Sequence, residues 1–324
     1  MSKIDDSRPE GEPSPEVGNP LRIPRSQLDF LDAAERVEKL DPFDRDEIGF
    51  SARLWAQLSL PYKNPGNLPK WQRRNGDTTL TMYPAELRDP KTGEDYTGYP
   101  YGVLPRYLLI WMVTEAKRQK TRKLFLGENL SQFMKKLGLA STGGTRGNIR
   151  ALNEQMRRLF GSTLKITEHT VSDNVFHERG SNMNIASEWD LFFSRFDPDD
   201  AALFESSITL SEEFYESLQT SSIPIDIGAI NALRKNNAGP MALDIYVWLC
   251  ARLPRVSGSR PAHIPWSVLA KQFGSDTKRL IDFRRKFISR LKKVELVYSE
   301  AKIDPTNSEL ILFRSPPAVP MKDS

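Results

Sequence analysis

The hydrophobic positions of this chain form two series of elements that follow one another in the same order. Each series opens with an apolar helix directly after a proline, predicted at residues 107–117 and 242–252. A short extended stretch comes next, at 123–126 and at 262–266, and then a second helix that ends in glycine. This repetition predicts two units of related fold.

The spacing within the two series supports the same interpretation. A tryptophan lies in the middle of each apolar helix, and a glycine ends the helix that follows. The count is 27 residues from Trp111 to Gly138 and 26 residues from Trp248 to Gly274. Two unrelated segments have no reason to keep this distance.

A longer helix with a basic outer face follows each glycine. Its apolar residues recur at helical spacing, from Ile149 to Phe160 in the first series and from Leu280 to Val294 in the second. Between residues 278 and 293 there are 8 lysines and arginines but only one carboxylate, Asp282. Protein surfaces usually mix the two signs, so this bias favours an acidic partner.

A pair of strands follows each basic helix. Leu164–Glu168 returns as Met183–Ser187, and Leu296–Tyr298 returns as Leu310–Phe313 around a turn that contains 304–308. Helix, short strand, helix, turn, basic helix and hairpin is the order of a winged helix-turn-helix domain. There the short strand and the hairpin form one small sheet, and the hairpin is the wing. The predicted fold is a helix-rich α+β protein with two tandem winged helix-turn-helix domains.

The segments ahead of the first series are less regular. Residues 1–20 are rich in proline and acidic residues, which predicts a disordered tail, and an amphipathic helix is expected at 26–40. Residues 61–100 contain 6 prolines and one clear strand, Thr78–Tyr83, so they are expected to be a loop-rich extension. The predicted domains are a disordered or weakly ordered acidic tail at 1–48, a first winged-helix domain with its extension at 49–200, a second at 201–315, and a C-terminal tail at 316–324.

The charge distribution strengthens the case for an acidic partner. The net charge is +4, but residues 1–50 carry −6 and residues 51–324 carry +10. A basic folded part attracts polyanions, and nucleic acid is the usual one. The alternative is a soluble protein that merely has a high isoelectric point.

Two further features indicate a cytoplasmic protein without a membrane partner. The longest unbroken apolar runs, such as Tyr107–Val113, have 7 residues, whereas about 20 are needed to cross a bilayer. The chain begins with an acidic segment that lacks the apolar stretch of a secretion signal. The single cysteine, Cys250, lies within an apolar run and is expected to be a buried packing residue.

The residues required by several enzyme classes are missing from the sequence. Gly138–Gly144 is the nearest stretch to a P-loop, and it continues with Thr145-Arg146 where a P-loop has lysine and a hydroxyl residue. The three histidines, His169, His177 and His263, are never closer than eight positions, which argues against a metal-dependent nickase and a zinc site. We therefore expect no enzymatic activity, no metal and no cofactor, with a carboxylate-only nuclease as the alternative.

Candidate DNA contacts follow from the chemistry of base readout. An α-helix fits the major groove, where arginine pairs with guanine and asparagine with adenine, while other cations and hydroxyls hold phosphates. The candidate DNA-binding residues are Arg146, Asn148, Arg150, Asn153 and Arg157 in the first series and Lys278, Arg279, Arg285, Lys286 and Lys293 in the second. Gly143, Gly144 and Gly147 either let the backbone approach a phosphate or shape the turn. The alternative for both helices is a solvated face of a helical scaffold.

Several long strings also point to a known family. They are Gly98–Ala116, Leu126–Gly127, Phe133–Leu139, Thr142–Gly144, Gln155–Phe160, Ile223–Asp226, Ala242–Leu249, Ile264–Trp266 and Gln272–Gly274. These strings, which lie within residues 75–315, resemble the plasmid-encoded RepA family of replication proteins. The N-terminal segment 1–50 has no such resemblance.

The resemblance implies a non-enzymatic initiator of bacterial plasmid replication. Such a protein binds repeated sites in the double-stranded DNA of the plasmid origin and helps to bring in host initiator and helicase proteins. Related double winged-helix initiators bind direct repeats as monomers and repress their own promoter as dimers, so a homodimer is expected by analogy. The alternatives are a plasmid or phage transcriptional repressor of the same fold, which would bind one inverted repeat, and an adaptor without specific DNA binding.

Overall fold

The computed structural model describes residues 24–89, 92–127, 129–139, 148–172, 175–192, 206–274 and 279–320. The helices in these ranges are α1 Arg25–Lys39, α2 Arg53–Gln57, α3 Leu104–Gln119, α4 Leu130–Lys136, α5 Asn148–Gly161, α6 Glu212–Ser221, α7 Ile227–Lys235, α8 Pro240–Arg252, α9 Trp266–Phe273 and α10 Leu280–Glu295, with a 3-10 turn at Leu253–Arg255. The strands are β1 Ile48–Ala52, β2 Trp71–Asn75, β3 Thr78–Tyr83, β4 Ala85–Arg88, β5 Asp95–Gly98, β6 Lys123–Gly127, β7 Thr163–Ser172, β8 Val175–Asn184, β9 Ala186–Asp190, β10 Ser206–Leu210, β11 Ser222–Asp226, β12 Ala262–Pro265, β13 Ile303–Pro305 and β14 Glu309–Leu312.

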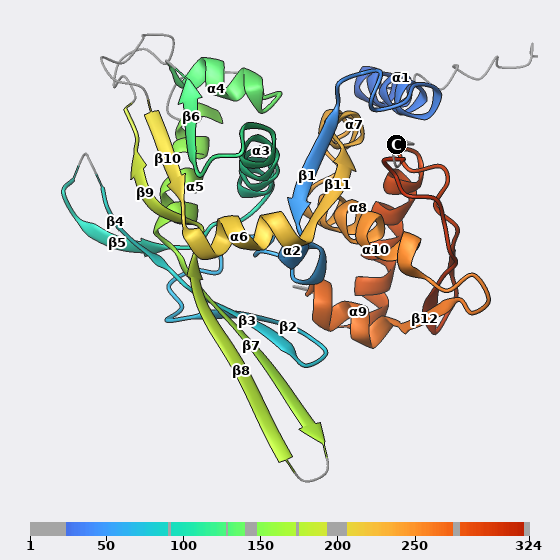
Figure 1. Ribbon diagram of the computed structural model, residues 1–324. Helices are drawn as coiled ribbons and strands as arrows, with labels where there is room; N and C mark the ends of the chain where they lie inside the picture. The colour runs from blue at the N-terminus through green and yellow to red at the C-terminus, as the bar shows by residue number, and fades with distance from the viewer. Residues whose placement is uncertain are drawn as a thin grey trace, which may run out of the picture.

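The strands pair into small antiparallel sheets, and the helices pack between and around them (Figure 1). The sheet orders are β1-β11, β6-β10-β9, β12-β14-β13, β2-β3-β7-β8 and β4-β5. The two predicted series are α3-β6-α4-α5-β7-β8 and α8-β12-α9-α10-β13-β14. The prediction of a mixed fold of helices and small sheets is confirmed.

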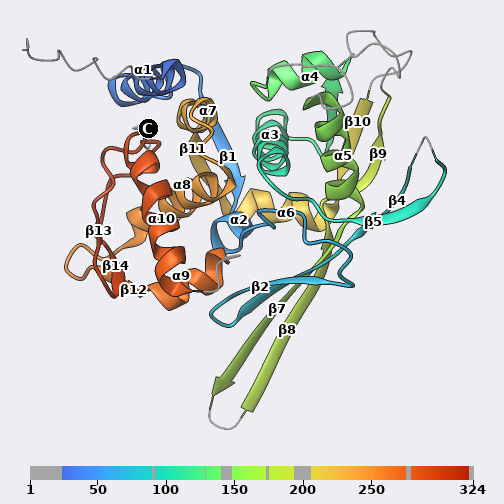
Figure 2. The same ribbon diagram turned by 180° about the vertical axis from the view of Figure 1, so that it is seen from behind.

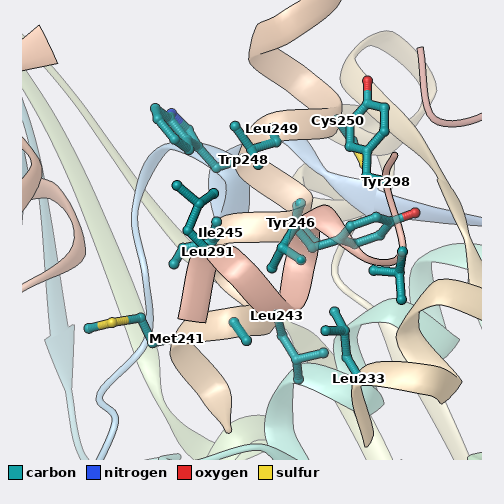
Figure 3. Close-up of a cluster of buried hydrophobic side chains, with 14 of the residues drawn as sticks. Leu233, Met241, Leu243, Ile245, Tyr246, Trp248, Leu249, Cys250, Leu291 and Tyr298 are labelled. Atoms are coloured by element: carbon teal, nitrogen blue, oxygen red, sulfur yellow. The ribbon is translucent and has the colours of Figure 1, made fainter. Parts of the chain in front are cut away.

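Two hydrophobic cores underlie the two halves of the molecule. The first half is built around α3, α5 and the sheets of β3 and β6, and the second around α8, α9 and α10. In the second, Trp248, Phe273 and Phe287 meet edge to face with ring centroids 5.1–6.4 Å apart, and Figure 3 shows Trp248 among its neighbours on α8. Most residues of α3 and α8 are buried, because both helices are enclosed on nearly every side. None of the helices in the described ranges is both long and apolar enough to span a bilayer.

The environment of Cys250 matches the sequence prediction. The side chain is buried in the second core, and burial raises the pKa of its thiol to about 12. The thiolate is therefore scarce at neutral pH, and the residue acts as a packing group.

The two halves differ in how the short strand finds its partner. In the second half β12 pairs with β14, so the short strand and the hairpin share one sheet as predicted. In the first half the prediction is wrong. Strand β6 pairs with β10, while the β7–β8 hairpin continues the sheet of β2 and β3. Alternation of apolar residues reports which face of a strand is buried but not which strand lies beside it.

The two hairpins also differ in how well the sequence predicted them. Leu164 lies opposite Met183 in a ladder that reaches Ser172 and Val175. The predicted return strand Met183–Ser187 is only partly right, because Ala186 and Ser187 belong to β9, which pairs with β10. The second hairpin begins at β13 and not at Leu296–Tyr298, which is a correction. The backbone N–H of Val297 donates to Val294, so this stretch is a turn that directly follows α10, with Val297 and Tyr298 buried.

The N-terminal segments are more ordered than the sequence suggested. Residues 1–23 lie outside the described ranges, but α1 packs on α7 and buries Phe30 and Ala34 in the second core. The prediction of a disordered or weakly ordered tail is thus wrong for residues 25–39, where the expected amphipathic helix forms. The extension at 61–100 contains β2, β4 and β5 besides the predicted β3. The division into domains stays a prediction, and β10 and α6, which follow the proposed boundary at 200, pack in the first core.

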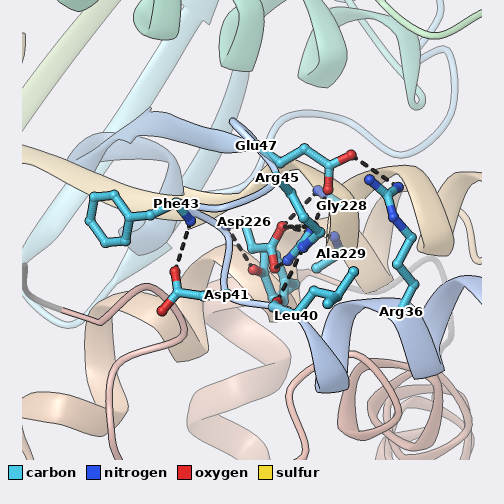
Figure 4. Close-up of polar contacts among 10 residues, drawn as sticks. Arg36, Leu40, Asp41, Phe43, Arg45, Glu47, Asp226, Gly228 and Ala229 are labelled. Carbon is cyan, nitrogen blue, oxygen red and sulfur yellow. Dashed lines mark hydrogen bonds and ion pairs between the residues drawn. The ribbon is translucent and has the colours of Figure 1, made fainter.

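Two buried ion pairs join segments that are far apart in sequence. Arg45, with 3% of its side chain exposed, holds Asp226 through contacts of 2.6 and 3.2 Å and also contacts Glu47 (Figure 4). This cluster secures β1 beside β11. Between the two halves, Arg106 of α3 binds both carboxylate oxygens of Asp244 on α8 at 2.7 and 2.8 Å.

Candidate nucleic-acid interface

The first candidate reading helix, α5, is exposed mainly along its N-terminal half. Leu152, Met156 and Leu159 anchor it in the first core. Asn148 and Arg150 are exposed, whereas Asn153 is half-buried. Arg146 and the glycines Gly143, Gly144 and Gly147 belong to residues 140–147, outside the described ranges.

The C-terminal half of α5 packs against the β4–β5 hairpin. Arg157 has 26% of its side chain exposed and donates to the backbone carbonyl of Arg88 at 2.6 Å. Its neighbour Arg158 donates to Glu154 at 2.8 Å, and the Tyr96 hydroxyl donates to the same carboxylate at 2.8 Å. Burial, together with this hydrogen bond to the carboxylate, raises the pKa of Tyr96. These contacts hold the β4–β5 hairpin on the helix, so the guanidinium of Arg157 is committed to packing.

The second candidate helix, α10, presents arginines at its N-terminus. Arg279 and Arg285 have 73% and 75% of their side chains exposed and flank Asp282. The hydrogen bond from Arg279, 2.7 Å long, lowers the pKa of that carboxyl. One anion between two arginines leaves this end of the helix positively charged, in addition to the partial positive charge of the helix terminus.

The other predicted cations of this half have different surroundings. Lys286 is half-buried, with its ammonium 5.9 Å from the centroid of the Tyr62 ring. Lys293 donates to the carbonyl and side-chain oxygens of Asn236, at 3.4 and 2.5 Å, and so caps the C-terminal end of α7. Burial lowers the pKa of Lys293. Lys278 lies outside the described ranges.

The second hairpin is attached to both α9 and α10. The Trp266 indole N–H at the start of α9 donates to the carbonyl of Thr306 at 3.1 Å. Arg284 of α10 donates to the side-chain oxygen of Asn307 at 2.8 Å and lies over the Trp266 ring, 5.9 Å from its centroid. The sequence did not distinguish Arg284 from the other basic residues of this helix, because its partners lie on other elements. The turn at 306–308 is thereby fixed beside α10.

The β7–β8 hairpin, the wing predicted for the first half, projects away from the body of the molecule (Figures 1 and 2). Its distal part exposes Val171, Val175 and Phe176, which have 63–74% of their surface accessible. His169 stacks on Phe176 and lies 3.3 Å from Glu178. The described residues of the hairpin carry as many carboxylates as lysines and arginines, so this wing lacks the excess of positive charge found on α10.

Comparisons with known proteins decide the family. The family model described as plasmid encoded RepA protein matches residues 99–267, more than half of the chain. The chain belongs to this family. The resemblance inferred from the sequence strings is confirmed, and the RepA family is one of plasmid replication initiators.

Two solved structures are also similar, although remotely. A structure of domains 2 and 3 of RctB shares 11% identity and covers 80% of this chain and 93% of that chain, with a TM-score of 0.44. A selenomethionine derivative of the same domains shares 10% identity and covers 84% and 98%, with a TM-score of 0.47. No curated protein matches. The assignment to the RepA family rests on the family model.

The matched residues include the first candidate helix and part of the second half. They run from just after β5 through α3, α5 and α8 to the start of α9. Helix α10 begins at Leu280, shortly after the matched region ends, and packs on α8 and α9. In the described ranges, no group of three histidine, cysteine or acidic residues is placed to hold a metal ion.

Proposed function

We propose that this RepA-family protein initiates plasmid replication by binding repeated sites in the origin through two winged helix-turn-helix heads. The family assignment supports the role in initiation. The observation that carries the DNA-binding part is the second head, in which a basic helix and a short hairpin are fixed to one another.

In this proposal α10 enters the major groove with its N-terminal end. Arg279 and Arg285 are exposed there and can reach base edges or phosphates. The turn at 306–308, which Trp266 and Arg284 hold beside the helix, would follow the adjacent backbone. Lys286 contributes charge beside them, and Lys278, at the preceding turn, stays a predicted contact.

The first head would use the N-terminal half of α5. Asn148 and Arg150 lie on its exposed side, and the predicted contact Arg146 precedes them directly. Asn153 is half-buried on the same helix. Arg157 and Lys293 are better explained by the intramolecular bonds that they make, so we do not include them in the DNA surface.

Recruitment of host initiator and helicase proteins, and self-association as a homodimer, stay predictions that rest on family membership. So does the absence of enzymatic activity, since initiators of this kind act by binding. A cytoplasmic location follows from the same proposal because the plasmid origin lies in the cytoplasm.

A footprint of the purified protein on DNA flanking its own gene tests the proposal. Protection of several direct repeats, with affinity falling steeply as salt rises, is the expected result because phosphate contacts release counterions. Arg285→Ala should weaken protection, whereas the matched control Lys39→Ala, on the exposed side of α1, should not. Protection of one inverted repeat over a promoter would instead identify a repressor, and no protection would refute specific binding in these flanks.

A further inference from the structure

We propose that Arg73 and Arg234 are positioning residues that fix the angle between the two candidate reading helices, each by placing its guanidinium against the glycine that follows α9 or α4 in the opposite half. That these helices read DNA rests on the proposed function. The contacts themselves are a property of the folded chain, and they can be tested without DNA.

The two turns share an unusual backbone feature. Gly138 follows α4 and Gly274 follows α9, at the positions where the sequence repeat places its glycines. Both have φ of +67°, a conformation that side-chain-bearing residues rarely adopt. The positive φ accounts for glycine at both places, and the neighbours of each glycine give a second reason.

At the first turn the neighbour comes from the second half. Arg234 lies on α7, whose residues pack in the second core. A Cβ added to Gly138 would lie 2.8 Å from Nη2 of Arg234 and 3.1 Å from Oδ1 of Asn231. Asn231 accepts a hydrogen bond from the same Nη2 at 3.3 Å, which orients the guanidinium toward the turn. The missing side chain at Gly138 therefore makes room for a group from the other half.

At the second turn the direction is reversed. Arg73 lies on β2, in the sheet that carries the first hairpin, and its guanidinium lies 4.8 Å from the centroid of the Trp71 ring. A Cβ added to Gly274 would overlap this guanidinium. The positive group lies at the C-terminal end of α9, where the helix dipole favours a cation. Beside it, Ser59 donates to the carbonyl of Phe273 at 3.0 Å.

The two contacts lie at opposite ends of the interface between the halves. Both ribbon views place α4 and α7 near one end of the molecule and α9 and β2 near the other (Figures 1 and 2). The buried pair of Arg106 and Asp244 joins α3 to α8 as a further connection. The packing of α2 on α8 and the pairing of β1 with β11 also join the halves. The two arginine contacts add to these connections at both ends of the interface and oppose rocking about them.

A fixed angle has a consequence for DNA recognition. Two heads on a flexible linker tolerate a range of site spacings, whereas rigidly joined heads bind together only where the spacing of the DNA matches. We therefore expect this protein to bind only those DNA sites in which the two segments contacted by its two heads are separated by a narrow range of distances.

The angle can be measured by pulsed electron paramagnetic resonance on the full-length chain. Spin labels at Ala151→Cys on α5 and Ser289→Cys on α10 both occupy exposed positions, and native Cys250 is buried. We expect a narrow distance distribution in this doubly labelled protein. Arg73→Ala and Arg234→Ala should each broaden it, and the two together should broaden it most.

Matched controls are provided by the neighbouring cations. Arg74 is exposed on β2 and donates to Gly76 of its own hairpin, and Lys235 is exposed at the end of α7. Arg74→Ala and Lys235→Ala should leave the distribution narrow. Circular dichroism and protection of Cys250 from thiol reagents verify folding of every variant. An unchanged width in folded Arg73→Ala and Arg234→Ala proteins would overturn the proposal.

A second measurement uses the DNA site located by footprinting. About 5 base pairs are inserted between the two DNA segments that the heads contact. Because one helical turn of the duplex is about 10 base pairs, this insertion moves the two segments to opposite faces. The unsubstituted protein should lose about tenfold or more in affinity, and the Arg73→Ala/Arg234→Ala protein should lose distinctly less. Equal losses would contradict the proposal. If the unsubstituted protein binds no site, the proposed function fails, while the resonance measurement still decides whether the arginines fix the angle.

Discussion

The buried ion pair between Arg106 and Asp244 allows a quantitative test of how the two halves are held together. Only 5% of the Arg106 side chain and 9% of the Asp244 side chain are exposed, and two hydrogen bonds of 2.7 and 2.8 Å join them. Arg106 also donates to the carbonyls of Gly102 and Leu60, at 2.6 and 2.9 Å. Its guanidinium therefore has partners on both sides of the interface.

Removing one partner leaves a charge without compensation in a site that excludes water. Asp244→Ala should lower the free energy of unfolding by about 3–5 kcal/mol, the usual cost of leaving a buried charge unpaired. The double variant Arg106→Met/Asp244→Ala contains neither charge, so it should lose less than Arg106→Met or Asp244→Ala alone. It retains a loss of about 1–3 kcal/mol because the carbonyls of Gly102 and Leu60 lose their donor.

Urea denaturation monitored by circular dichroism gives these free energies by linear extrapolation. The reasoning predicts a coupling energy of about 2 kcal/mol or more between the two substitutions. Additive losses, or an Asp244→Ala protein within about 1 kcal/mol of the unsubstituted chain, would refute it. The control Glu115→Ala removes a half-buried carboxylate from the same helix α3, 4.0 Å from Arg118, and should cost little.

The remaining predictions separate DNA contacts from packing contacts. Arg285→Ala should weaken specific DNA binding by about 1–3 kcal/mol in a footprint titration and leave the free energy of unfolding unchanged. Arg157→Ala should do the reverse, lowering stability by about 1 kcal/mol in urea denaturation while DNA affinity is kept. Trp266→Phe removes the hydrogen bond to Thr306 and should also cost about 1 kcal/mol, with a weaker footprint at the edge of the site. Cys250, with its pKa raised to about 12, should resist a thiol-reactive dye at pH 8 until denaturant is added; rapid labelling of the folded chain would contradict its burial.

The sequence by itself determined the elements whose signal is local. The long apolar runs predict that α3 and α8 are buried helices, and the alternation that starts at Leu164 predicts a strand of the β7–β8 hairpin. The glycines at 138 and 274 could be recognised from the sequence because a backbone position with positive φ favours glycine whatever lies beside it. The family strings were recognised for the same reason, since they lie along continuous segments.

Tertiary structure alone decided which segments lie side by side. Periodicity shows that β6 has a buried face, but its partner β10 belongs to a distant part of the chain, beyond the β7–β8 hairpin. Helix α5 was expected to present Arg157 to DNA, and only the folded chain brings the β4–β5 hairpin to that side chain. Lys293 and Arg73 likewise found their neighbours, Asn236 and Gly274, in distant segments. A hydrophobic pattern encodes how deeply a residue is buried, whereas the partner of a charged side chain depends on the packing of distant elements, which is settled only when the whole chain folds.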